Sequence, residues 1–399
     1  MSKWKEIVFS DLFSEGTRNG VFKTNGKPVV DARLIGMGTL FHNDFIRRSP
    51  EETLGLTADE YARFSVRAGD LLFGRRSLVE SGAGKVSLVV AVDSPTVFES
   101  SLIRVRLDPS KADPRFYAYY FKAGVGRGRI FALVNGAAVK GIRSSDLQKV
   151  VVHCPPLPTQ KRIVDILSAY DDLIENNRRR MEILEESARL IFKERFEDVW
   201  ERGKLPHGWQ ACYVPDCIEV EPEVSNPHCD KIRYIPMAAL STSGMTIDVT
   251  KTEMRPKATS VRFANDDVLL AGITPCLENG KTGFVNFLEE NEVACGSTEF
   301  IVLRGRTVSP YFTYCLSRTE RFRETAIKSM VGASGRQRVQ PECFDTYEIA
   351  LPTTTILREF DELVEPMFEQ IGLLVKQNQD LAEARDMLLP KLMKNNSKI

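Results

Sequence analysis

The clearest hydrophobic pattern in the chain runs through residues 155–200. Apolar side chains recur there every seven positions in two interlocked series, with alternating steps of three and four residues. This spacing places both series on one stripe of an α-helix, as in the seam of a coiled coil. About 40 helical residues make a rod of roughly 60 Å. A narrow stripe on so long a helix cannot bury itself, so the pattern predicts a partner helix.

The partner is predicted at the other end of the chain. When the seam positions are shifted by 197 residues, they fall on residues 360–388, where seven of the nine positions are apolar. One asparagine lies in each seam, and a polar seam residue usually fixes register and partner. We expect antiparallel packing, because a domain-sized segment separates the helices, and a late start or a kink near Pro366. The residues predicted to pair the helices are Leu167, Tyr170, Ile174, Asn177, Met181, Leu184, Met367, Ile371, Leu374, Asn378 and Leu381.

The same shift also relates the segments that precede the helices. Residues 68–73 (AGDLLF) are matched by 265–270 (NDDVLL), and residues 113–116 (DPRF) are matched, one residue off this shift, by 309–312 (SPYF). A period near half the chain length predicts two copies of one unit, each a globular domain followed by a long helix. The predicted segments are residues 1–153, 154–203, 204–350 and 351–399.

Each globular segment mixes two kinds of local pattern. Short β-branched or alternating runs are bounded by Gly, Asp and Pro, which is typical of strands. Pro114 and Pro310 each open a run that reads as a helix. The predicted fold is therefore α+β: two mixed α/β domains in tandem repeat, separated by two long helices that pack as an antiparallel coiled coil.

The chain as a whole has balanced charge, but basic side chains are concentrated in two regions. The chain has 399 residues with 54 basic and 54 acidic side chains. Residues 104–143 nevertheless contain nine Lys or Arg and two acids, and residues 304–338 contain eight and two. Matched basic regions in two repeats suggest a polyanion that is held at two places. Ordinary solvated surface is the alternative for either region alone.

The remaining composition indicates a cytoplasmic protein. No apolar run approaches the length of a membrane helix, and the first residues do not form a signal peptide. The eight cysteines include no C-x-x-C pair, so we expect reduced thiols.

Glycine-bearing loops in the two repeats are the candidate nucleic-acid contacts. Glycine lets the backbone approach a phosphate, while Arg and Gln make bidentate contacts to guanine and adenine. Hairpin turns of a soluble domain would look similar. The predicted DNA-binding residues are Arg75, Arg76, Ser77, Lys85, Lys140, Arg143, Thr274, Lys281, Thr282, Arg336, Gln337 and Arg338.

No catalytic or metal centre is predicted. Residues 280–282 (GKT) lack the upstream glycine at the spacing of a P-loop. Cys212 and Cys217, followed by residues 228–229 (HC), fit no familiar zinc spacing. No nucleophile, base and carboxylate stand in a recognisable arrangement.

A family resemblance rests on these same segments. Residues 159–196 (TQKRIVDILSAYDDLIENNRRRMEILEESARLIFKERF) resemble the central conserved region of Type I restriction–modification specificity subunits. Residues 266–283, 296–304 and 332–339 resemble the second target recognition domain of that family. The resemblance covers essentially the whole chain, although the C-terminal helix keeps only Leu351-Pro352 of the proline run.

The resemblance implies a non-catalytic DNA reader. Each recognition domain would read one half of a bipartite double-stranded DNA target, and the paired helices would set the spacer. The helices would also dock methyltransferase subunits, two in number, that bind S-adenosylmethionine and methylate adenine. A motor–nuclease subunit would join for restriction, and this chain itself would hold no cofactor. The alternatives are a protein–protein scaffold and a stand-alone DNA-modifying enzyme, although the chain lacks the Asn/Asp-Pro-Pro-aromatic motif of a methyltransferase.

Overall fold

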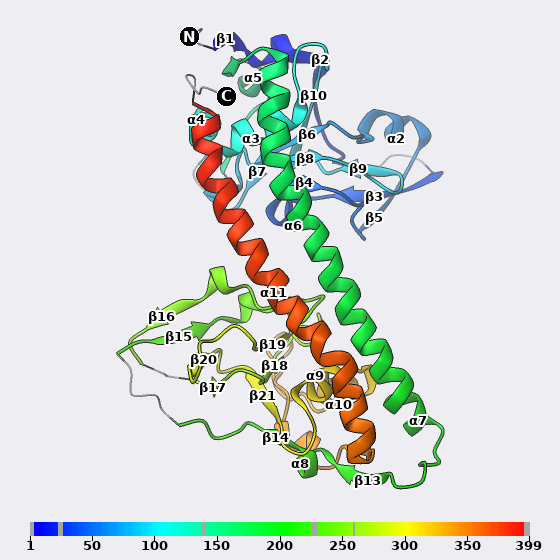
Figure 1. The fold of residues 1–399 in the computed structure, drawn as a ribbon. Coiled ribbons are helices and arrows are strands. Elements are labelled where there is room, and N and C mark those ends of the chain that lie inside the picture. The colour runs from blue at the N-terminus through cyan, green and yellow to red at the C-terminus, as the bar shows by residue number, and fades with distance from the viewer. Residues whose placement is uncertain (1–3, 23–26, 137–139, 226–229, 258–259, 395–399) are drawn as a thin grey trace. The chain divides into compact units, whose positions relative to one another are not determined.

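The structure is a computed structural model that describes residues 4–22, 27–136, 140–225, 230–257 and 260–394 (Figure 1). The chain forms two compact units. Unit 1 comprises Met1–Asp172 and Leu381–Ile399, and unit 2 comprises Leu173–Asp380. Each unit therefore contains one globular part and a segment of both long helices, whereas the four-segment division predicted from the sequence remains a proposal.

The globular part of unit 1 is built on a five-stranded sheet with the order β2-β10-β6-β8-β4 and a three-stranded sheet with the order β5-β3-β9. Two further strand pairs are β1·β12 and β7·β11. The strands are β1 (Lys5–Val8), β2 (Phe13–Asn19), β3 (Val30–Ile35), β4 (Phe45–Ile46), β5 (Thr53–Leu56), β6 (Leu71–Gly74), β7 (Arg76–Ser77), β8 (Val86–Val89), β9 (Thr96–Phe98), β10 (Leu102–Leu107), β11 (Lys140–Gly141) and β12 (Val151–Cys154). The α-helices are α1 (Met37–His42), α2 (Ala58–Phe64), α3 (Pro114–Lys122), α4 (Gly124–Phe131) and α5 (Ser144–Gln148), and the short 3-10 helices are η1 (Phe9–Leu12) and η2 (Glu80–Gly82).

The globular part of unit 2 contains two four-stranded sheets, with the orders β14-β21-β18-β19 and β16-β15-β20-β17, and the pair β13·β22. The strands are β13 (Gln210–Tyr213), β14 (Ile218–Val220), β15 (Ile232–Ile235), β16 (Glu253–Arg255), β17 (Arg262–Phe263), β18 (Val268–Ala271), β19 (Thr282–Phe284), β20 (Ala294–Gly296), β21 (Phe300–Gly305) and β22 (Glu348–Leu351). The α-helices are α8 (Val214–Cys217), α9 (Pro310–Ser317) and α10 (Glu320–Lys328), and the 3-10 helices are η4 (Met237–Ala239), η5 (Val249–Lys251) and η6 (Pro341–Phe344).

The two globular parts repeat one topology, which confirms the predicted tandem repeat. In unit 1, β10 lies between β2 and β6; in unit 2, β21 lies between β14 and β18. The second sheets match too, because β3·β9 and β15·β20 are both parallel. Even a buried ion pair is duplicated, since Arg106 Nε lies 2.6 Å from Asp70 and Arg304 Nη2 lies 2.6 Å from Asp267.

Both long helices form as predicted. The first, α6 (Leu157–Phe192), is followed by a π-helical turn (Lys193–Glu197) and by α7 (Asp198–Glu201). The second, α11 (Thr354–Leu392), begins before Pro366, so the expected late start is wrong. Pro366 is exposed. The helix therefore tolerates the proline because the carbonyl group that loses its hydrogen-bond donor lies on the solvent side, where water can replace the donor.

Within each unit the two helices run antiparallel. In unit 2, the rings of Phe192 and Phe360 lie 6.0 Å apart, and Asn177 Nδ2 donates to Asn378 Oδ1 at 2.9 Å. Residues later in α6 thus contact residues earlier in α11. In unit 1, Arg385 of α11 donates a hydrogen bond to Asp171 of α6.

The buried face of α6 differs from the predicted stripe in one series. In the series that begins at Leu167, Leu167, Ile174 and Ala188 are buried as predicted. In the series that begins at Ile163, Ile163 and Asn177 are also buried as predicted, but Tyr170, Leu184 and Ile191 are only half-buried. The residues that follow these three, Asp171, Glu185 and Phe192, are buried instead. The reason is that an α-helix turns every 3.6 residues and that the globular part of each unit also covers it.

The shift places two carboxylates in the interior, and each meets a tyrosine. In unit 1, Tyr119 of α3 donates to Asp171. In unit 2, Tyr314 of α9 donates to Glu185 Oε1 at 2.6 Å, and the Met245 backbone N–H donates to Oε2 at 2.8 Å. Since α3 and α9 are matched elements of the repeat, the same hydrogen bond fixes α6 onto both globular parts.

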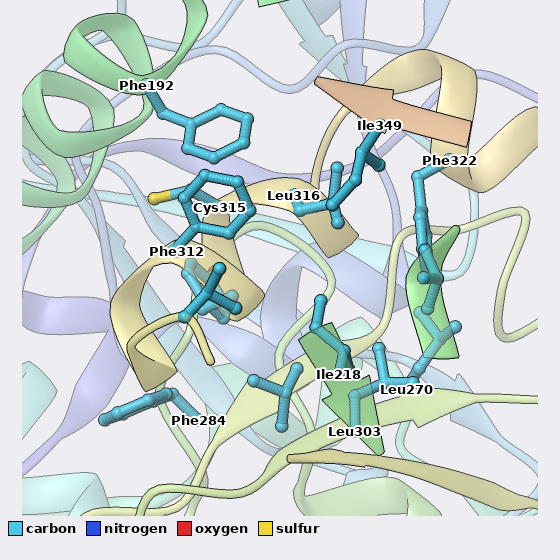
Figure 2. Packing of buried hydrophobic residues seen from close by; sticks show 14 of the residues in the cluster. Phe192, Ile218, Leu270, Phe284, Leu303, Phe312, Cys315, Leu316, Phe322 and Ile349 are labelled. Atoms are coloured by element: carbon cyan, nitrogen blue, oxygen red, sulfur yellow. The ribbon is translucent and has the colours of Figure 1, made fainter. Parts of the chain in front are cut away.

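Apolar packing surrounds this contact in unit 2. Figure 2 shows Phe192 of α6 facing Phe312 of α9, and the two rings lie 4.9 Å apart in an edge-to-face arrangement. Strand residues Ile218, Leu270 and Leu303 belong to the same buried cluster. The segment of α6 in unit 2 is thus part of that unit's core.

We predict that Tyr314→Phe destabilises the protein by about 1–3 kcal/mol, because it leaves a buried carboxylate oxygen of Glu185 without its donor. Urea unfolding of the full chain measures this change. The matched control is Tyr311→Phe in the same helix, whose hydroxyl donates to the exposed Glu365 at 3.0 Å; it should cost less than about 0.5 kcal/mol. Equal effects of the two substitutions would contradict the prediction.

Candidate nucleic-acid interface

In each unit, the predicted loops that lie far apart in the sequence meet in space. In unit 1, β7 and β11 form a two-stranded ribbon, with Lys140 opposite Ser77 and Gly141 opposite Arg76. In unit 2, the Thr274 backbone N–H donates to the Gln337 carbonyl at 3.0 Å, and the Gln337 N–H donates to Thr274 Oγ1 at 3.0 Å. Each unit thus has its own composite surface, which is made of two loops.

We call the first member of each pair the glycine loop: residues 75–84 in unit 1 and residues 272–280 in unit 2. The two glycine loops are anchored in the same way. Lys85 Nζ donates to the Phe41 carbonyl at 2.9 Å, and Lys281 Nζ donates to the Met237 carbonyl at 3.0 Å. The Phe41 carbonyl lies near the end of α1 and the Met237 carbonyl at the start of η4, so these lysines fix the loops to short helices rather than project from them.

Arginines from the following helices hold the other side of the glycine loops. Arg127 of α4 donates to the carbonyls of Ser81 at 2.8 Å and Ala83 at 3.2 Å. Arg323 of α10 donates to the carbonyls of Leu277 at 3.3 Å and Glu278 at 3.1 Å. The helices that carry basic charge therefore use part of it to shape the loops.

Each glycine loop closes at a glycine in the left-handed region. Gly84 has φ 66° and Gly280 has φ 78°. A Cβ atom at Gly84 would lie 2.2 Å from Ile130 Cγ2. Both the backbone conformation and the close approach of α4 therefore require glycine at this position.

Among the predicted DNA-binding residues, three arginines are exposed and form no ion pair with any residue that the structure describes. These are Arg76, Arg143 and Arg336. Arg338 is also exposed, but it makes a two-point contact with Glu299 at 2.8 and 2.7 Å. Phosphate oxygens or base edges can reach the first three directly, whereas Arg338 would have to exchange a partner.

Arg75 combines partial burial with positive surroundings. Its Nη1 donates to the Ser100 carbonyl at 3.2 Å. Burial and the neighbouring charge of Arg76 lower the pKa of the Arg75 guanidinium. The pair concentrates positive charge at the start of the glycine loop of unit 1.

Other predicted residues contribute to loop structure. Ser77 and Thr274 are buried and accept backbone hydrogen bonds from Val79 at 3.1 Å and from Gln337, respectively. Thr282 is fully buried in β19. Lys140 lies 4.0 Å from Glu80, and Gln337 is half-buried.

The predicted helix-pairing residues fall into two groups. Leu167, Ile174, Asn177, Ile371 and Leu374 are buried. Tyr170, Met181, Leu184, Met367, Asn378 and Leu381 are half-buried. The polar contact between the two long helices in unit 2 involves one residue more than the two predicted asparagines. Asn177 Nδ2 also donates to Gln377 Oε1 at 2.9 Å.

Sequence reasoning missed Arg127 and Arg323 as loop anchors. The available signal was their shared spacing, since they lie 196 residues apart, as do Lys85 and Lys281. Basic charge alone does not distinguish a residue that supports a loop from one that contacts a ligand.

The described residues contain no metal-binding cluster, and unit 2 has a cleft of mixed charge. No group of three or more His, Cys, Asp or Glu side chains that could hold a metal occurs among the described residues, and residues 228–229 of the zinc candidate lie outside them. A cleft of about 480 Å³ in unit 2 lies between the end of α6 and α9–α10, and its lining includes Arg189, Arg318 and Glu320. Its mixed charge favours no single ligand class.

In the part of the chain that the structure describes, no helix has the length and apolarity needed to cross a membrane.

Comparisons with known proteins point in one direction. Residues 1–186 match a family model described as the Type I restriction modification DNA specificity domain. The chain is 27% identical over 299 residues to the MjaIX specificity subunit of a Type I restriction enzyme from Methanocaldococcus jannaschii, covering 69% of this chain and 68% of that protein. It is 26% identical over 198 residues to the Escherichia coli EcoAI specificity subunit, covering 48% of this chain but only 33% of that protein.

The fold has a solved counterpart. The crystal structure of a Type I restriction–modification S subunit from M. genitalium aligns with 98% of this chain and 96% of its own, with a TM-score of 0.54 and 15% identity. At that identity, the likeness shows a shared fold.

We predict that Arg127→Met speeds backbone amide exchange in residues 77–84, because the carbonyls of Ser81 and Ala83 lose their donor. Hydrogen–deuterium exchange of the full chain measures this. The matched control is Arg129→Met in the same helix, since Arg129 pairs with Glu6 and the Val151 carbonyl instead. Unchanged protection of residues 77–84 in Arg127→Met would contradict the anchoring role.

Proposed function

The chain belongs to the Type I restriction–modification specificity subunits, and from this premise we propose that each of its two units reads one half of a split DNA target. The observation that carries the proposal is the duplicated surface described above. A glycine loop fixed by a Lys and an Arg occurs twice, each time beside an exposed arginine. One such surface could serve many ligands, whereas two in tandem fit two contact sites on one polymer.

The chemistry of these surfaces suits double-stranded DNA. A two-stranded ribbon such as β7·β11 is an element that the major groove admits. Arginine contacts guanine O6 and N7 bidentately or neutralises a phosphate. Arg76 and Arg143 would supply these contacts in unit 1, and Arg336 and Gln337 in unit 2. Ser77, Thr274 and Thr282 would support the loops instead.

The long helices are proposed to set the spacer between the half-sites and to dock methyltransferase subunits. Exposed apolar side chains on α6 and α11 would line this docking face, because apolar groups that gather in one exposed patch mark an interaction site. These side chains are Ile183, Leu190, Leu363, Leu373 and Met387. Asp171 and Glu185 do not belong to this docking face, because both are buried and accept hydrogen bonds from tyrosines of the globular parts.

The partners complete the proposed activity. Two methyltransferase subunits would bring S-adenosylmethionine and transfer the methyl group to adenine, and a motor–nuclease subunit would add restriction. This chain would contribute sequence choice and assembly, in the cytoplasm where its DNA target lies. The matched relatives are named specificity subunits, and no contact among the residues that the structure describes favours a stand-alone enzyme or a scaffold without DNA.

We predict that Arg76→Ala combined with Arg336→Ala weakens DNA binding by the assembled complex at least tenfold. If both side chains contact phosphates, the slope of log K against log salt should fall by about two. Titration of a labelled duplex at several salt concentrations measures both quantities. The control is Arg358→Ala, which removes one positive charge from an exposed position on α11 and should leave affinity and salt slope unchanged.

Wild-type affinity and salt dependence in the double variant would contradict the assignment of these arginines. A wild-type complex that assembles but shows no salt-dependent DNA affinity would contradict the DNA-reading function itself.

We also predict that four residues inserted in both α6 and α11, beside Asn177 and Asn378, lengthen the spacer of the target. Four helical residues add about 6 Å, or about two base-pair steps. Mapping modified adenines in a genome measures the spacer and both half-sequences. The same insertion within residues 204–209, outside the helices, should leave the spacer unchanged. Altered half-sequences with a constant spacer would contradict the role of the helices.

A further inference from the structure

The glycine loop of unit 1 carries two exposed aliphatic side chains that the contacts above do not use. Leu78 is 86% exposed and Val79 is 51% exposed. Single exposed aliphatic side chains are common on protein surfaces, so exposure alone indicates little. These two are adjacent, directly follow the β7·β11 ribbon, and belong to a loop whose backbone is held in place.

Several contacts hold the tip of that loop. Ser77 Oγ accepts from the Val79 N–H at 3.1 Å, and the Val79 carbonyl accepts from the Gly82 N–H at 3.1 Å. A Cβ atom at Gly82 would lie 2.4 Å from Phe41 Cζ and 2.4 Å from Ser77 Oγ. The loop is therefore packed closely beneath its tip. A tip that is already ordered loses little conformational entropy when it binds.

The charges around the tip favour a polyanion. Arg76 precedes Leu78 by two residues and is exposed. Lys85 and Lys140 follow nearby, each with one carboxylate within reach: Asp44 lies 3.5 Å from Lys85, and Glu80 lies 4.0 Å from Lys140. The two arginines at positions 75 and 76 form no ion pair with the residues that the structure describes. An apolar tip flanked by unpaired cations suits nucleic acid better than an apolar protein surface.

Duplex DNA offers one apolar group on its base edges. The 5-methyl group of thymine lies in the major groove, the same groove that admits a two-stranded ribbon. We propose, building on the function proposed above, that Leu78 and Val79 contact thymine methyl groups in the half-site read by unit 1. The neighbouring Arg76 would contact a phosphate or a guanine in the same groove.

Unit 2 provides an internal comparison. Its glycine loop starts at the matched place, since the Arg75 N–H donates to the Ser101 carbonyl and the Gly272 N–H to the Glu299 carbonyl, each at 2.7 Å. Its leucine, Leu277, is fully buried, whereas Glu278 and Asn279 are exposed. Apart from Pro275, the exposed side chains of that loop are polar, so we expect its half-site to be read there without a contact from a leucine or valine to a methyl group.

The test combines a protein change with a DNA change. The full chain is assembled with its methyltransferase subunits, and its target is mapped. Each thymine in either half-site is then replaced in turn by deoxyuridine, which removes only the methyl group. Duplex affinities are measured for the wild type, Leu78→Ala, Val79→Ala and Leu78→Met.

We expect at least one deoxyuridine to weaken wild-type binding about fivefold, as the loss of one buried methyl contact would. Leu78→Ala or Val79→Ala should weaken binding to the thymine duplex by a similar factor and lose the sensitivity to deoxyuridine. Leu78→Met should keep most of both. The matched control Val151→Ala removes an aliphatic side chain that is 41% exposed on β12 and should behave as the wild type.

Three results would overturn the inference while leaving the DNA-reading function intact. The first is a target without thymine, or one in which no deoxyuridine weakens binding. The second is equal deoxyuridine sensitivity in the wild type and in both alanine variants. The third is loss of subunit assembly in Leu78→Ala, which would make the tip a protein contact. Failure of the wild-type complex to bind DNA at all would instead remove the proposed function and this inference together.

Discussion

The structure depends on burying the narrow apolar stripe of α6. A helix of 36 residues cannot cover that stripe alone. In each unit, α11 covers part of it and the globular part covers the rest, so the helix belongs to both cores. A buried hydrogen bond from a tyrosine to a carboxylate, Tyr119 to Asp171 and Tyr314 to Glu185, fixes α6 against each globular part. Burying a carboxylate costs desolvation free energy unless the group is hydrogen-bonded. A different register of α6 would separate these carboxylates from their tyrosine donors, so the two hydrogen bonds disfavour other registers.

The globular parts use one framework for two different surfaces. The same residue types anchor both glycine loops, namely a lysine at the end of the loop and an arginine from the following helix. The exposed tips differ: Leu78 and Val79 in unit 1, Glu278 and Asn279 in unit 2. A fixed framework with variable tips is what a reader of two unlike half-sites needs, because binding residues belong on loops that a rigid scaffold positions.

The sequence predicted the elements that depend on local pattern. Heptad spacing identified both long helices, the 197-residue shift identified the tandem repeat, and the resemblance carried by residues 159–196 is confirmed by the specificity-subunit relatives. Features set by tertiary packing could not be predicted. Thr282 is buried because it lies in β19, whereas Arg336 is exposed in a loop, and this difference depends on the packing around each residue. The one-residue shift to Asp171 and Glu185 depends on which globular face covers the helix, and the continuity of α11 through Pro366 depends on the side that faces solvent.

The most direct test of the central claim is to co-express this chain with its methyltransferase subunits and map modified adenines across a genome. Two recognition units predict one split motif: two short, unlike half-sequences separated by a gap of constant length. A single continuous motif would contradict the claim, because it would need only one reading unit. The same modification pattern from the methyltransferase subunits without this chain would contradict its role in specificity altogether.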